Sequence, residues 1–93
     1  MVDEAIEKMI KQYPKDKFIM KMLEECAELS EVLLKTLTKA EGYKPPLEKI
    51  IEEMGDVLFR AKALSRKLGI DDEVEARFQE KGVILNNYLT EKV

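Results

Sequence analysis

The sequence LEKIIEEMGDVLFRAKALSRKL, residues 47–68, is the clearest structural signal in this chain. Its apolar residues recur at helical spacing, which predicts an amphipathic helix from about Pro46 to Leu68. Gly69 follows as the expected C-terminal stop. The apolar stripe of this helix is made of Leu47, Ile50, Ile51, Met54, Val57, Leu58, Ala61, Leu64 and Leu68.

The residues before this stretch also have helical spacing. The pattern predicts a first helix over residues 2–12, ended by Pro14, and a second over about residues 17–40. Asp16 is the expected N-cap of the second helix, because a short side chain with an oxygen can accept from the first free backbone N–H groups. The second and third helices should then form an antiparallel hairpin.

The connections and the last helix follow from the same signals. Gly42 is expected to close the second helix, and residues 43–46 to form an extended connector. Asp71 is the expected N-cap of a fourth helix over residues 72–91. The expected buried face of that helix is made of Val74, Phe78, Ile84, Leu85, Tyr88 and Leu89.

The length of 93 residues predicts a single all-α domain over residues 1–93. A compact chain of this mass exposes about 5,500 Å². The second helix, at roughly 36 Å, is long for so small a domain. We therefore expect self-association, as a homodimer or a homotetramer, to cover its excess apolar surface.

Composition excludes several classes of function. The net charge of -3 provides no overall basic field, so we expect neither nucleic acid nor an anionic membrane as a partner. The absence of histidine excludes His-ligated zinc and His-dependent nucleophilic catalysis. A single cysteine, Cys26, an acidic N-terminus and the lack of a long apolar run favour a cytoplasmic location.

Two acidic stretches stand out, EECAE at residues 24–28 and EEMGD at residues 52–56. Each contains two carboxylates three residues apart, which lie on one helix face about 5–6 Å apart at Cβ. On adjacent antiparallel helices, two such pairs would surround one point. Hard cations such as Mg²⁺ take oxygen ligands of this kind and share them with substrate phosphates. The pairs are Glu25 with Glu28 and Glu53 with Asp56.

An ordinary solvated acidic surface is the alternative, because a chain with 19 acidic residues contains such pairs by chance. Three features favour a metal site. The acids border apolar stripes, and only Asp56 has a base one turn later, Arg60. Gly55 also lies mid-helix, where either helix contact or close approach of a ligand would explain it. Comparable acid pairs elsewhere are Glu4 with Glu7, Glu28 with Glu31, and Asp72 with Glu75.

At these residues the sequence resembles the MazG-like, all-α nucleoside triphosphate pyrophosphohydrolases. That family carries E-E-x-x-E on one helix, as at residues 24–28, and E-x-x-D on the next, as at residues 53–56. The VLF of residues 57–59 is similar to the end of the family's second motif. The later LGID of residues 68–71, followed by a helix containing Lys81, is similar to the family's C-terminal part.

The resemblance covers roughly residues 17–90 and implies a four-helix MazG-like bundle with a long central antiparallel hairpin. It implies hydrolysis of a nucleoside triphosphate between the α and β phosphates, with Mg²⁺ or with Mn²⁺ in its place. Glu25 and Glu24 would be catalytic, with Glu24 as an extra ligand, an orienting group or the base for water. The implied metal ligands are Glu25, Glu28, Glu53 and Asp56, and the implied substrate-binding cations are Lys81, Arg77 and Lys21.

Two alternatives remain open at this point. One is a catalytically idle helical module of the same shape, with an oligomerisation or regulatory role. The other is a phosphoribosyl-ATP-type pyrophosphohydrolase on the same scaffold. The histidine expected in that second branch directly after the second motif is absent, since Val57 to Arg60 reads VLFR.

Overall fold

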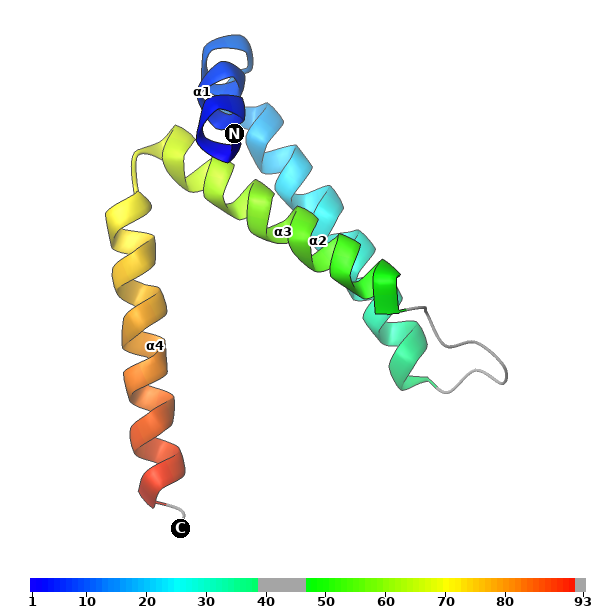
Figure 1. Cartoon of the computed structure of the whole chain (residues 1–93), viewed down its shortest axis with the longest axis vertical. Coiled ribbons are helices and arrows are strands. Elements are labelled where there is room, and N and C mark those ends of the chain that lie inside the picture. Colours follow the sequence, from blue (N-terminus) through cyan, green and yellow to red (C-terminus); the bar gives the residue numbers. More distant parts are fainter. Residues whose placement is uncertain (39–46, 92–93) are drawn as a thin grey trace.

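The computed structural model describes residues 1–38 and 47–91, and within these ranges it contains helices and no strand (Figure 1). The all-α prediction is therefore confirmed. The expected closure at Gly42 and the expected connector over residues 43–46 lie outside the described residues. The helices are α1 (Val2–Gln12), α2 (Lys15–Leu37), α3 (Leu47–Leu68) and α4 (Asp71–Glu91).

The turn between α1 and α2 differs from the prediction. Asp16 lies in the first turn of α2, and Pro14 occupies the N-cap position with extended backbone angles of φ -75° and ψ 164°. The carbonyl of Pro14 accepts from the N–H of Lys17 at 3.1 Å. The assignment of Asp16 as N-cap is wrong because the ring of Pro14 fixes the entry of the chain into the helix two residues earlier.

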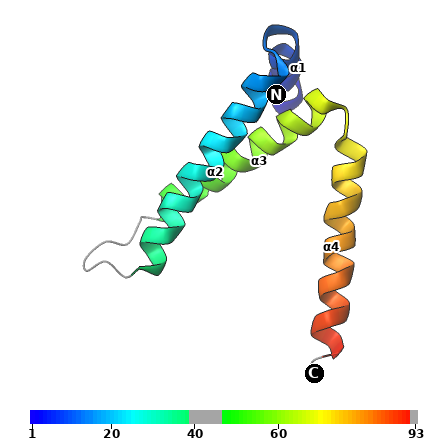
Figure 2. The same ribbon diagram turned by 180° about the vertical axis from the view of Figure 1, so that it is seen from behind.

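Helices α2 and α3 pack side by side and antiparallel, and α1 lies across the end of this hairpin where α2 begins (Figures 1 and 2). The core sits at that crossing. Ile6 from α1, Phe18 from α2 and Ala63 from α3 are buried in one cluster, with Phe59 and Leu64 packed against it. The core is therefore small and lies at one end of the long hairpin.

A polar network joins α3 to its neighbours. Gly69 ends α3 with φ +70°, which confirms the predicted stop. Asp71 is the first residue of α4 rather than its N-cap, because its carboxylate accepts from the Ser65 hydroxyl and from Arg66 Nε at 3.2 Å. Arg66 also donates to Asp3 of α1 at 3.0 Å. One guanidinium thus ties the first, third and fourth helices together.

Helix α4 leaves the hairpin at an angle, and no residue of it is buried (Figures 1 and 2). The predicted buried face is therefore exposed in the single chain, with Phe78 at 70%. That prediction is wrong because α4 packs only against α3, close to the turn that joins them. The radius of gyration is 16.6 Å, against about 12 Å for a compact chain of this length.

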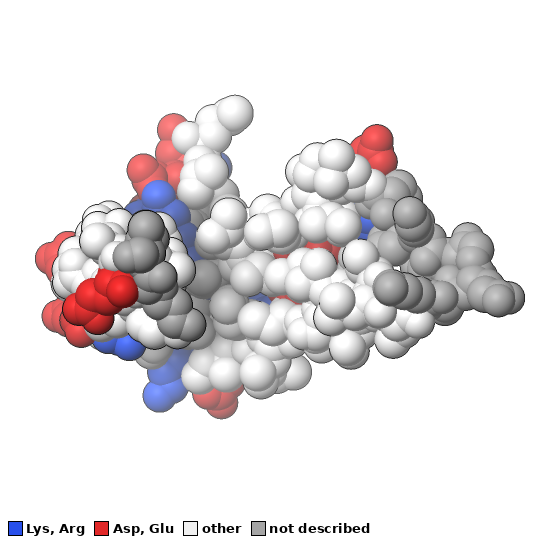
Figure 3. Space-filling model, turned by 90° about the horizontal axis from the view of Figure 1, so that it is seen from below, with Lys and Arg blue, Asp and Glu red and all other residues white. Residues whose placement is uncertain are grey.

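The hairpin also exposes apolar side chains. Figure 3 views the molecule from the side on which α4 ends, and most of the hairpin surface seen there carries no charged atoms. Some acidic and basic atoms are recessed between these uncharged side chains. Among the described residues, no helix is long and apolar enough to cross a bilayer. Exposed members at helical spacing are Ile19, Leu23, Leu34 and Leu37 on α2, and Leu47, Ile51, Met54 and Leu58 on α3.

Candidate metal centre

The hairpin brings three of the predicted ligands together. Carboxylate oxygens of Glu25 from α2 and of Glu53 and Asp56 from α3 all lie within 4.8 Å of one another. Spacing of three residues places Glu53 and Asp56 on one face of α3, and antiparallel packing brings that face to α2. The convergence predicted from two short stretches of sequence is therefore present in the fold for these three side chains.

Glu53 is the most unusual member of the cluster, because its side chain is only 3% exposed. Its Oε1 accepts from Lys49 Nζ at 2.9 Å, while its Oε2 is buried with no partner. Oε2 of Glu25 is likewise buried and has no hydrogen-bond partner. A buried carboxylate oxygen without a donor costs free energy, so these two atoms call for a compensating positive group.

Glu28 borders the cluster from the α2 side. The neighbouring charge of Glu25, partial desolvation and the charge of Glu53 together raise the pKa of the Glu28 carboxyl above its usual value. Glu28 and Glu53 line a hollow of about 250 Å³ together with Glu31, Val32, Lys35 and Lys49. The neighbouring acids therefore raise the pKa of the Glu28 carboxyl even though Lys49 forms an ion pair with Glu53.

The compensation predicted from sequence is partly wrong. Asp56 and Arg60 are one turn apart, yet no ion pair joins them, and the Arg60 guanidinium lies 5.6 Å from the centroid of the Phe59 ring. Lys49, one turn before Glu53, makes the close contact instead. The hydrogen bond to Glu53 and the charges of Glu52 and Glu53 raise the pKa of the Lys49 ammonium.

Glu24 and Gly55 lie beside the cluster without entering it. Glu24 is exposed, and its Oε2 accepts from Lys21 Nζ at 3.1 Å. That ion pair occupies both a predicted catalytic group and a predicted substrate-binding cation. A Cβ added at Gly55 would meet no atom within 4 Å, so contact with a neighbouring helix does not explain this glycine within the described residues.

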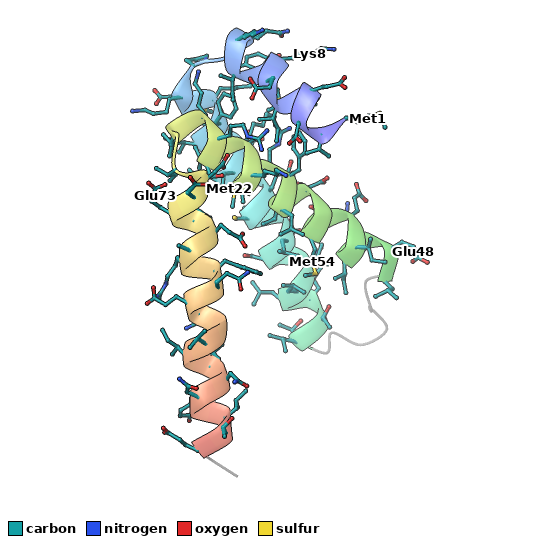
Figure 4. The ribbon with its side chains drawn as sticks, turned by 60° about the vertical axis from the view of Figure 1, so that its left-hand side comes forward. Met1, Lys8, Met22, Glu48, Met54 and Glu73 are labelled. Atoms are coloured by element: carbon teal, nitrogen blue, oxygen red, sulfur yellow. The ribbon has the colours of Figure 1, made fainter. Side chains whose placement is uncertain are left out.

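The two predicted cations on α4 do not reach the acids in this chain. Helix α4 packs against α3 only beside the connecting turn and stands apart from the hairpin beyond it (Figure 4). Arg77 is instead paired with Glu80 of its own helix at 2.9 Å, and Lys81 lies exposed one turn further along. Their substrate-binding role stays a prediction, because within one chain neither side chain lies near the acidic cluster.

The donor set fits a hard divalent cation. All the atoms are carboxylate oxygens, which Mg²⁺ and Mn²⁺ accept, and no thiolate or imidazole is among them. The two unpartnered oxygens of Glu25 and Glu53 are the places where a cation would supply the missing positive charge.

No family model, curated protein or solved structure matches the chain at a significant level. The family resemblance therefore stays a prediction based on the motifs.

Proposed function

We propose that this protein is a Mg²⁺-dependent nucleoside triphosphate pyrophosphohydrolase that yields a nucleoside monophosphate and pyrophosphate. The observation that carries the proposal is the pair of buried, unpartnered carboxylate oxygens on Glu25 and Glu53, converging with Asp56 from the second motif. Carboxylates on a surface helix normally point to water. A cluster with two desolvated oxygens is the arrangement expected of a cation site.

Each acid has a role in this proposal. Glu25, Glu28, Glu53 and Asp56 would hold the divalent cation. When bound, the cation would neutralise phosphate charge and lower the pKa of bound water. Glu53 anchors the site because burial and Lys49 fix its side chain. Glu24, exposed beside the cluster, would accept a proton from the attacking water once its contact with Lys21 loosens.

The proposal includes a second copy of the chain. The accessible surface is 7,532 Å², about 2,000 Å² more than a compact chain of this mass exposes. Burying that excess in a dimer would remove roughly 4,000 Å² in total, which is in the range of obligate homodimers. Lys81 and Arg77 lie on helix α4, which has no buried residue. In a dimer they would contact the acidic cluster of the second copy.

A release assay tests the proposed function. The full-length protein would be incubated with Mg²⁺ and a panel of ordinary, deoxy and oxidised nucleoside triphosphates, and pyrophosphate and phosphate would be measured separately. Pyrophosphate with a stoichiometric monophosphate, abolished by EDTA, supports the proposal. Orthophosphate and a diphosphate as products, or no turnover of any panel member, would contradict it.

The idle helical module is the second candidate, because apolar surface exposed along three helices is what an oligomerisation element needs. Metal uptake separates the two candidates. An idle module would retain the helical assembly but would show no saturable binding of Mg²⁺ or Mn²⁺. A wild-type protein that binds either ion at the acidic cluster but turns over no substrate would favour a regulatory role.

A further inference from the structure

A cavity lies about one helical turn away from the acids, where α1 crosses the hairpin. Its volume is about 330 Å³, and it is lined by Met9, Tyr13, Lys17, Phe18, Lys21 and Arg60. Three of these six side chains are cations, although the chain as a whole has a net charge of -3. The volume is at the lower end of the range for small-molecule pockets.

The cations of this cavity are poorly compensated. Neither Lys17 nor Arg60 has an ion pair with a carboxylate of the described residues, and each lies over an aromatic ring instead. Lys17 Nζ is 5.8 Å from the centroid of the Tyr13 ring. Only Lys21 has an acidic partner, the exposed Glu24. A pocket of converging cations with few carboxylates attracts an anion.

The cavity and the acidic cluster share the same two helices. Lys21 precedes Glu25 by one turn on α2, and Arg60 follows Asp56 by one turn on α3. Because α2 and α3 are antiparallel, both cations are displaced from the acids in the same direction along the hairpin. The cavity and the acidic cluster are therefore neighbours along the hairpin.

We infer that this cavity, through Lys17, Lys21 and Arg60, is a phosphate-binding pocket that takes the pyrophosphate end of a nucleotide. The inference rests on the proposed function only for the identity of the ligand, because the cationic cavity itself would bind a phosphate-bearing anion without any metal. Arg60 offers a planar fork for two phosphate oxygens, and the two lysines add point charges. Lys17 Nζ lies over the ring of Tyr13, which also lines the pocket.

Calorimetric titration of the full chain with inorganic pyrophosphate in EDTA tests this inference. Wild type should show saturable binding, which Arg60→Gln and Lys17→Gln should each weaken by about tenfold or more, as expected for a lost charge-assisted hydrogen bond. Arg60→Lys should recover part of the affinity, which would exclude a folding defect. Lys8→Gln is the matched control, because Lys8 is an exposed cation of α1 outside the cavity (Figure 4).

Two further arms separate this inference from the proposed function. Glu53→Gln should abolish turnover yet keep metal-free pyrophosphate binding, and an α,β-methylene nucleoside triphosphate should compete with pyrophosphate. Binding that needs Arg60, without any hydrolysis, would support the pocket and remove the proposed function. No metal-free binding, or binding indifferent to both Arg60→Gln and Lys17→Gln, would overturn the pocket and leave the proposed function standing.

Discussion

Among single residues, Glu53 is central to the proposed cation site, because its side chain is buried and its Oε2 has no hydrogen-bond partner. We expect Glu53→Gln to abolish turnover. The metal-free protein should become more stable by about 1 kcal/mol, because the amide can donate to the unpartnered oxygen of Glu25 and the repulsion falls. Urea unfolding in EDTA, followed by circular dichroism, measures this change.

The matched control is Glu52→Gln, one residue earlier. Glu52 is 61% exposed and contacts the same lysine, with its Oε2 3.7 Å from Lys49 Nζ. This variant removes the same charge from the chain and should leave both turnover and metal-free stability nearly unchanged. Equal loss of activity in the two variants would show that overall charge, rather than the cluster, matters.

A second prediction for a single residue concerns the stability effect of replacing Gly55. Its backbone is helical and the space around it is open, so Gly55→Ala adds a methyl group without a clash in the single chain. The substitution should stabilise the protein by up to about 1 kcal/mol through helix propensity alone. Thermal unfolding measures the gain. A loss of stability, or a loss of substrate affinity with the fold intact, would show that a partner or ligand approaches this position.

At the level of helices, the hydrogen bonds that join α3 to α4 lead to a prediction about stability and pH. The Ser65 hydroxyl, followed by Arg66, holds the pKa of the Asp71 carboxyl below its usual value. A carboxyl whose pKa is lower in the folded state contributes stability above its unfolded value of 3.8, and this contribution is lost as the pH falls through the folded value. Asp3 acts in the same direction through Arg66.

We therefore expect Asp71→Asn to lower the free energy of unfolding at pH 7, and this deficit to shrink as the pH falls below about 4. Urea unfolding at several pH values measures both effects. Asp72→Asn is the matched control, since Asp72 is exposed and makes no hydrogen bond or ion pair that joins α4 to α3. A deficit that stays constant down to pH 2.5 would remove the Asp71 carboxylate from the junction.

The elements themselves were largely predictable from sequence. Periodicity and Gly69 placed α1, α3 and the α3–α4 turn to within a residue or two. The caps at Asp16 and Asp71 were not, because capping rules treat a helix end alone. In the fold, Pro14 starts α2, and Asp71 binds Arg66 of the preceding helix. Long-range partners of this kind leave no local signal.

The convergence of the candidate ligands was predictable to a similar degree. The spacing within each helix, combined with the antiparallel hairpin, was enough to predict that Glu25, Glu53 and Asp56 lie close together. Sequence could not show that Lys49 rather than Arg60 would neutralise an acid, because rotamers depend on the facing helix. Of the cations in the cavity, Lys21 was among the predicted substrate-binding residues, but the cavity itself was not predicted. Met9 and Tyr13 line it together with residues of the hairpin, and only the fold joins them.

The whole molecule is more extended than a compact single-chain bundle. Because it exposes many apolar side chains, we expect copies of the chain to associate. Val74, Phe78 and Leu85 lie on one face of α4, and Val74 and Phe78 also line a groove of about 540 Å³ against α3. We expect light scattering to show a dimer or tetramer. Phe78→Glu should shift it towards monomer, because a charge would be buried in the interface.

Val83→Glu is the matched control for the assembly. Val83 is also exposed, at 61%, but helical geometry places it on the side of α4 opposite Phe78. It should leave the assembly intact. A wild-type protein that remains monomeric at high micromolar concentration, or equal disruption by both variants, would contradict the proposed second copy.

We propose that divalent cations occupy the acidic cluster. Calorimetric titration of the metal-free wild-type protein with Mn²⁺, repeated with Mg²⁺, measures this binding. The expected result is saturable binding of Mn²⁺ that Glu25→Gln and Glu53→Gln each abolish and that Glu52→Gln retains. Absence of binding to wild type, or binding unaffected by the loss of Glu25 and of Glu53, would contradict it.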